Sequence, residues 1–218
     1  MSRPHKLASI AALALLLAAA RADIIDRIAV SVGNRVITAG DIDREIRVTA
    51  FLNGAKPDFS PVSRRSTAER MVEQKLIRRE LETSRYPVPE PSEVEPAVAQ
   101  LRKQYPNDEA WQRALADNGI TEQDLKDELL WQRTLLLFIE VRFRPGVQVS
   151  DQEIDDYFHS VVEPAAKAAH PDEPVSIADY RSQIEEKLAG QRVDQEVDSW
   201  LKRARARAEI VYHEEAFQ

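Results

Sequence analysis

Four histidines could take part in metal binding or proton transfer, because a neutral imidazole serves both purposes. They lie at positions 5, 159, 170 and 213 of the 218-residue chain. No two are four residues apart, the spacing that places two imidazoles on one helical face for metal binding. The sequence contains no cysteine, which excludes thiolate metal sites, a thiol nucleophile and disulfides. We therefore expect no metal centre and interpret the histidines as surface residues.

Other catalytic patterns are also missing from the sequence. It contains no Gly-x-Ser-x-Gly elbow, no phosphate-binding P-loop and no Gly-x-Gly-x-x-Gly fingerprint. Acid pairs at 155–156 and 185–186 lie on predicted helices, where solvated charge is the ordinary explanation. The basic run 202–207 ends another predicted helix, where cations complement the helix dipole. We predict no catalytic residues, no cofactor and no enzymatic activity.

Residues 1–22 have the pattern of a secretory signal peptide. Arg3 and Lys6 precede an apolar run at 7–20, and the segment ends with Ala-Arg-Ala, a small-x-small cleavage pattern. The run is too short for a bilayer core of about 30 Å, and a buried N-terminal helix is the alternative. We expect a mature chain from Asp23 that works outside the cytoplasm and has no transmembrane segment.

The composition indicates an acidic, helical protein. Cleavage after residue 22 removes three basic residues and no acidic one, so the net charge changes from −7 to −10. Such a charge argues against nucleic-acid binding, which requires clustered Lys and Arg to neutralise phosphates. Abundant Ala, Leu, Glu and Arg favour helices, and only six glycines disfavour a turn-rich β-sandwich.

Three short segments have the pattern of β-strands. β-Branched residues at 28–32 and 35–37 flank Gly33-Asn34, a pair that tolerates the positive φ of a tight hairpin. Residues 209–212 form a similar segment near the C-terminus. Strands this short are marginal unless paired. We therefore predict a mainly α fold with one small sheet, formed by the N-terminal hairpin and the C-terminal strand.

Capping residues predict where the helices begin. A Ser or Thr followed three residues later by Asp or Glu can satisfy the first free N–H groups of a helix. Prolines at 87–91 predict a stiff connector, and those at 164–174 predict a linker over residues 159–175. The predicted helices cover residues 38–52, 61–85, 92–105, 107–118, 121–143, 150–158 and 176–207.

The helix predicted at 121–143 is unusual because it is apolar on nearly all sides from Leu129 onward. Such a helix is either central to the core or partly exposed in order to bind something. If part of it is exposed, we expect Trp131, Leu135 and Phe138 to form the binding surface.

The order of several short phrases resembles the N-terminal chaperone region of the SurA family of periplasmic chaperones and peptidyl-prolyl isomerases. The resemblance covers residues 27–158. The phrases are Val-Gly-Asn-Arg-Val-Ile-Thr at 32–38, Asp-Ile-Asp at 41–43, Leu-Ile-Arg-Arg-Glu-Leu at 76–81, Val-Pro-Glu-Pro-Ser-Glu-Val-Glu at 88–95, Asn-Gly-Ile-Thr-Glu-Gln-Asp-Leu at 118–125 and Val-Ser-Asp-Gln-Glu-Ile at 149–154.

The resemblance implies a chaperone region at 23–158 and a C-terminal helix and strand at 176–218 that pack back on it. Family members usually insert parvulin domains of about a hundred residues between these parts. Here residues 159–175 replace them, and a packed domain rarely has fewer than about 50 residues.

The function implied is ATP-independent holding of unfolded outer-membrane protein precursors in the periplasm. The outer-membrane assembly machinery is a further candidate partner, and Trp131, Leu135 and Phe138 are the expected client-binding residues. Two alternatives remain: a peptidyl-prolyl isomerase or its non-catalytic companion, and a dedicated envelope adaptor.

Overall fold

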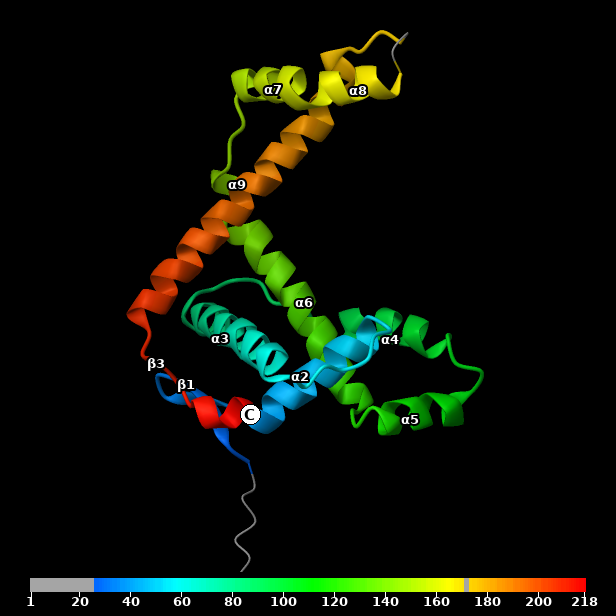
Figure 1. Ribbon diagram of the computed structural model, residues 1–218, viewed down its shortest axis with the longest axis vertical. Coiled ribbons are helices and arrows are strands. Elements are labelled where there is room, and N and C mark those ends of the chain that lie inside the picture. The colour runs from blue at the N-terminus through cyan, green and yellow to red at the C-terminus, as the bar shows by residue number, and fades with distance from the viewer. Residues whose placement is uncertain (1–25, 171–172) are drawn as a thin grey trace, which may run out of the picture.

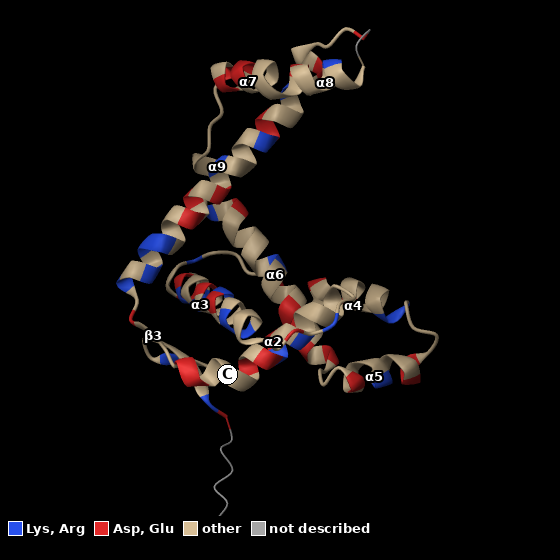
Figure 2. Ribbon diagram, viewed as in Figure 1, with Lys and Arg blue, Asp and Glu red and all other residues tan. Residues whose placement is uncertain are grey.

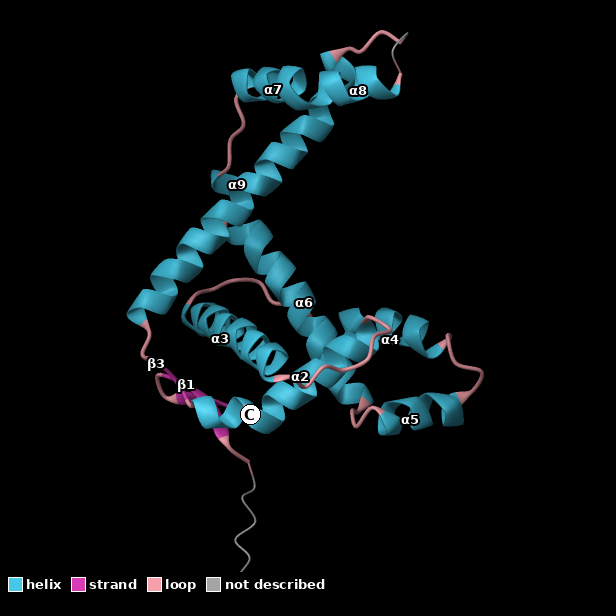
Figure 3. Cartoon of the chain, in the orientation of Figure 1, coloured by secondary structure: helices cyan, strands magenta, loops and turns pink. Residues whose placement is uncertain are grey.

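A computed structural model describes residues 26–170 and 173–218. The predicted signal peptide lies outside these residues. The described chain is mainly helical and contains one small sheet (Figure 3). Helices α7 (Asp151–Tyr157) and α8 (Glu163–Ala169) lie at one end of the molecule, away from α4 (Glu95–Arg102) and α5 (Asp108–Asp117). The long α9 (Ile177–Arg207) runs from beside α8 to the sheet, and α6 (Glu122–Arg142) runs from the region of α4 and α5 toward α9 (Figure 1).

The sheet joins the two ends of the described chain. Strands β1 (Ile28–Val32), β2 (Arg35–Thr38) and β3 (Ile210–Tyr212) are antiparallel in the order β2-β1-β3. Gly33, with φ of 58°, makes the hairpin turn, a conformation that few other residues adopt readily. The predicted sheet of hairpin and C-terminal strand is therefore confirmed.

Two helices cover the inner face of this sheet. Helix α2 (Ala39–Leu52) begins at Thr38, whose hydroxyl and Asp41 form a capping box, and α3 (Pro61–Thr83) begins with proline after Ser60. A final 3-10 turn at Glu214–Phe217 adds Phe217 to the same core. The core is built from Ala29, Val30, Val32, Ile37, Ile42, Ile46, Ala68, Val72, Leu76, Ala216 and Phe217.

A second core holds α4 (Glu95–Arg102) and α5 (Asp108–Asp117) against α2 and the start of α6 (Glu122–Arg142). A 3-10 turn at Pro91–Val94 precedes α4, so the connector becomes regular slightly before the α-helix begins. Trp111, the largest fully buried side chain here, donates a hydrogen bond from Nε1 to Glu122 Oε2 (2.9 Å). This bond satisfies the polar atom of a buried indole.

The C-terminal half is built around α9 (Ile177–Arg207). Its first turns pack on α7 (Asp151–Tyr157) in a small core of Ile154, Phe158 and Ile184. Further along, Val193 and Trp200 enter a core shared with α3 and α6. A short segment then leads to β3, so α9 connects the far end of the molecule to the sheet (Figure 1).

Most of the segment predicted as a linker, residues 159–175, is helical. A π-helical turn at Phe158–Val162 continues α7 into α8 (Glu163–Ala169). Pro164 stands at the second position of α8, where its missing N–H leaves no hydrogen bond unmade. Residues 171–172 lie outside the description.

Candidate functional site

Helix α6 carries the residues that we predicted to bind a partner. It begins at a capping box in which Thr121 Oγ1 accepts a hydrogen bond from Asp124 N (3.1 Å) and Asp124 Oδ2 accepts one from Thr121 N (2.7 Å). The helix ends at Arg142, just before a 3-10 turn over Arg144–Gly146.

The structure does not expose the three predicted residues. Trp131 and Phe138 are buried, and Leu135 is half-buried against the same core. The Phe138 ring meets Tyr86 and Trp200 edge-on, with centroids 5.2 and 5.7 Å away. Of the two alternatives for this helix, these three residues follow the core one, because residues spaced by four and three share the face of α6 that packs on α3 and α9. In this arrangement a partner cannot contact Trp131 or Phe138.

The apolar surface of α6 lies on its other sides. Leu136 is 65% exposed and Val141 is 41% exposed, while Leu130 and Leu137 are half-buried. None of the four belongs to a hydrophobic core of the described chain. Leu130, Leu137 and Val141 share one side of the helix, whereas Leu136 lies roughly 100–140° away from them around the helix axis. We call these four the outer apolar residues of α6.

Charged contacts border these residues and fix the connector that runs along α6. Arg133 Nε donates to Glu93 Oε2 (2.6 Å), and Arg142 Nη1 donates to the Tyr86 hydroxyl (2.6 Å). The backbone N–H of Glu90, followed by Arg133, lowers the pKa of Glu93. The connector is thus anchored at both ends, and the outer apolar residues have a polar border.

A second group of exposed apolar side chains lies on the sheet. Ile28, Val36 and Val211 are each between 44% and 47% exposed. Ser31 lies directly opposite Val36 on one side and Val211 on the other, so these valines flank it across the three strands. The sheet thus presents a small apolar outer face between its two edge strands.

A charged cleft of about 190 Å³ lies between α2, α3 and α6. Glu45 accepts long hydrogen bonds from Arg70 (3.3 Å) and Gln74 (3.4 Å), and Glu128 faces the same cleft. Burial, followed by repulsion from Glu45, raises the pKa of Glu128. The carboxylate of Glu45 therefore opposes the ionisation of Glu128 in this cleft.

Two of the three histidines of the described chain contact acidic residues close in sequence, and the third contacts a serine from the other end of the chain. His159 Nδ1 lies 2.7 Å from Glu163 Oε2 on the same helical segment, and His170 lies 3.7 Å from Glu173. His213 Nε2 lies 3.5 Å from the Ser31 hydroxyl. Within residues 26–170 and 173–218, no three His, Asp or Glu side chains are arranged to hold a metal ion.

The outer apolar residues were missed by the sequence analysis for a definite reason. Because α6 is apolar on nearly all sides, the spacing of its side chains does not indicate which face packs inward. The only indication in the sequence was that this helix has more apolar residues than one buried face requires.

No helix among the described residues is both long and apolar enough to cross a bilayer. No family model matches this chain, and no curated protein matches it.

Proposed function

We propose that this protein is an ATP-independent periplasmic chaperone of the SurA type, lacking the parvulin domain, that holds unfolded outer-membrane protein precursors. The predicted signal peptide supports a periplasmic location. The order of the short sequence motifs between residues 27 and 158 supports the likeness to the SurA family. We further propose that the N-terminal helices, α9 and the sheet together form a SurA-like chaperone core.

The pairing of β1 with β3 is consistent with this proposal. The resemblance implies that a C-terminal helix and strand return to the N-terminal region, and here Val30 pairs with Tyr212 and Val32 with Ile210. Helix α9 also supplies Trp200 to the core around Phe138. The two parts of the chain thus share one hydrophobic core.

The observation that carries the proposal is the apolar surface of α6 outside the cores. The sequence contains no nucleotide-binding motif, so binding and release must be reversible and depend on contact alone. Outer-membrane strands alternate apolar and polar residues, so each strand offers small, repeated apolar contacts. Leu136 and Val141, which are exposed and lie on different sides of α6, suit weak contacts of this kind.

An aggregation assay tests the proposal directly. A β-barrel precursor is diluted from urea, without ATP, into buffer containing the chain from residue 23 onward, and light scattering is followed. We expect suppression at a near-stoichiometric ratio. Added salt should weaken it little, because apolar contact depends less on screening than charge attraction does.

A pair of variants locates the binding surface. Partial burial of an exposed Leu or Val contributes about 1 kcal/mol, so the loss of both in L136Q/V141Q should weaken client binding roughly thirtyfold. The matched control is V62Q/V88Q, which removes two equally apolar residues that are 79% and 61% exposed on α3 and the connector. The control should suppress aggregation as the unchanged protein does, and circular dichroism should show both variants folded.

Two outcomes would contradict the proposal. If the folded protein gives no protection at about tenfold excess, the holdase assignment is wrong. Recovery of a single stoichiometric protein from envelope extract, in place of many β-barrel precursors, would then favour a dedicated adaptor. If protection occurs but L136Q/V141Q and V62Q/V88Q behave alike, α6 is not the client surface.

A further inference from the structure

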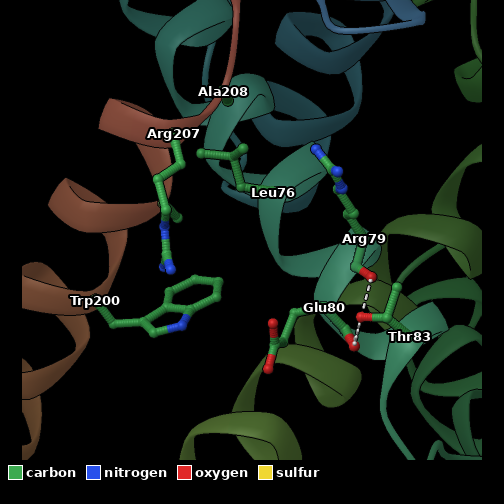
Figure 4. Close-up of a pocket in the computed structure, with 8 residues that line it drawn as sticks. Leu76, Arg79, Glu80, Thr83, Trp200, Arg207 and Ala208 are labelled. Carbon is green, nitrogen blue, oxygen red and sulfur yellow. Dashed lines mark hydrogen bonds between the residues drawn. The ribbon is translucent and has the colours of Figure 1, made fainter.

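A groove separate from the outer apolar residues of α6 lies between the C-terminal ends of α3 and α9. Its volume is about 260 Å³. Leu76 and Trp200 are the buried residues that line it, and Ala204 completes the apolar part. In Figure 4, Arg207 reaches toward the indole of Trp200, and Arg79 lies on the far side of Leu76. The groove therefore has an apolar floor, with one arginine on each side of Leu76.

These two arginines differ from their neighbours in having no carboxylate partner. Arg142 forms an ion pair with Glu80 (3.7 Å), and Arg205 forms one with Glu73 (2.8 Å). Within the described residues, no ion pair involves Arg79, and the only side-chain hydrogen bond of Arg207 goes to the Arg203 carbonyl (3.2 Å). The donors of both guanidinium groups are thus largely available to a ligand.

The local charge is opposite to that of the chain as a whole. The protein carries a net charge of −7, yet the last turns of α9 are rich in basic residues (Figure 2). Glu80 also lines the groove, but its pairing with Arg142 offsets its charge. Arg79 and Arg207 leave the groove positive, which complements an anionic ligand.

We infer that this groove binds the free C-terminal carboxylate of a polypeptide whose last residue is apolar. A planar guanidinium matches the geometry of a carboxylate and forms charge-assisted hydrogen bonds with it. Leu76, Trp200 and Ala204 offer the last side chain an apolar surface. Capture of a terminal carboxylate is an established mode of peptide recognition.

The size of the groove favours the end of a chain over a whole small molecule. Sites that enclose cofactors or drug-sized ligands usually have volumes of roughly 300–1,000 Å³. The groove is smaller and suits one residue with its terminal carboxylate. The inference does not depend on the chaperone proposal, because a short peptide suffices to test it.

The three tryptophans allow a site-specific test by NMR with an acetylated hexapeptide ending in phenylalanine. The indole N–H signal of Trp200 should shift on titration, while those of Trp111 and Trp131, which do not line the groove, should stay in place. A Trp200→Phe variant identifies the signal. The same peptide with a C-terminal amide should bind at least about tenfold more weakly, since it cannot form the charge-assisted bonds.

Charge-removing variants locate the carboxylate. Arg79→Gln and Arg207→Gln should each weaken binding of the acid peptide about tenfold and leave binding of the amide peptide unchanged. Arg203→Gln is the matched control, because Arg203 is exposed on the same helix but does not line the groove. It should change the affinity less than about twofold, because an exposed charge that makes no contact with the ligand is screened by solvent and salt.

Three results would overturn the inference. The first is equal binding of the acid and amide peptides, and the second is equal affinity in Arg79→Gln, Arg207→Gln and the unchanged protein. The third is a Trp200 shift caused by decanoate but not by the acid peptide, which would assign the groove to a fatty acid. None of these results bears on the aggregation assay, which depends on α6.

Discussion

Val32 of β1 and Ile210 of β3 are antiparallel partners, although they lie near opposite ends of the chain. Next to this pair, Gly33 N donates a hydrogen bond to Glu209 O (2.8 Å), which extends the ladder by one bond. The hairpin alone would be marginal, so the C-terminal strand supplies the third member of the sheet.

Deletion of residues 176–218 should leave an insoluble or molten remainder. It removes Val193 and Trp200 from the core shared with α3 and α6, and Phe217 from the core beneath the sheet. Near-ultraviolet circular dichroism and gel filtration measure the outcome. As a control, Phe217→Ala should unfold cooperatively at a lower temperature, because it only opens a cavity. A truncated protein that stays monomeric and melts cooperatively would contradict this prediction.

Two substitutions on α6 should lower the free energy of unfolding by very different amounts. Phe138→Ala removes a fully buried ring that contacts Trp200 and should cost about 3–5 kcal/mol of unfolding free energy. Leu136→Ala, on the exposed side, should change it by less than about 0.5 kcal/mol. Urea titration measures both. Similar values for the two variants would show that the faces of α6 are assigned incorrectly.

Glu153 should stabilise the protein only above strongly acidic pH. Hydrogen bonds from the backbone and hydroxyl of Ser150, together with Arg192, lower its pKa from 4.5 to about 2. A lowered folded-state pKa contributes stability above the unfolded value, and that stability is lost as the pH falls from 4.5 toward 2.

Glu153→Gln should therefore lower the melting temperature at pH 7, and the difference from the unchanged protein should disappear near the pKa of about 2. Asp155→Asn, on the exposed side of the same helix, is the charge-matched control and should have little effect. A difference that persists unchanged at the acidic limit would rule out the ionised carboxylate as its cause.

Glu128 should have the opposite pH dependence. Burial and Glu45 raise its pKa, so its contribution to stability is greatest at low pH and falls as the pH rises above the ordinary value of 4.5. Glu128→Gln should raise the melting temperature at pH 7 by about 2–4 °C at most, since partial exposure screens the repulsion.

The increase in melting temperature caused by Glu128→Gln should become smaller as the pH is lowered, because Glu128 itself then becomes neutral. Glu109→Gln, an exposed residue of α5, makes the same charge change and should not shift the melting temperature noticeably. A lower melting temperature for Glu128→Gln at pH 7 would mean that the carboxylate is favourably paired.

The protein should not accelerate prolyl cis/trans exchange. Uncatalysed exchange takes tens of seconds, and catalysis requires a pocket shaped around the proline. Residues 159–175 are too few for a parvulin domain. A protease-coupled proline-peptide assay is the measurement, with buffer alone as the control. A rate that increases in proportion to the protein concentration would support the isomerase alternative.

Sequence alone determined most helix starts and the hairpin. Thr38 with Asp41, Thr121 with Asp124, and Ser150 with Glu153 all form the capping boxes predicted for them. These contacts span three residues and depend on little beyond the local chain, so a short phrase suffices to predict them. The Gly33-Asn34 turn is local in the same sense.

Longer-range features were predicted less well. Prolines predicted a linker at 159–175, but Pro164 fits the first turn of α8, and residues 158–162 pass from α7 into α8 through a π-helical turn. Proline breaks a helix only in its interior, and the sequence did not reveal where that interior begins. Phe158, buried against α9, stabilises the helical path.

The face of α6 that packs inward was decided only by the tertiary structure. Trp131, Leu135 and Phe138 turn toward α3 and α9, whereas Leu136 and Val141 remain exposed. Periodicity identifies a buried face only when polar residues mark the opposite side, and α6 lacks that contrast. The choice depends on which surfaces α3 and α9 present, and those helices come from distant parts of the chain. Local sequence therefore predicted the helix, and packing selected its exposed surface.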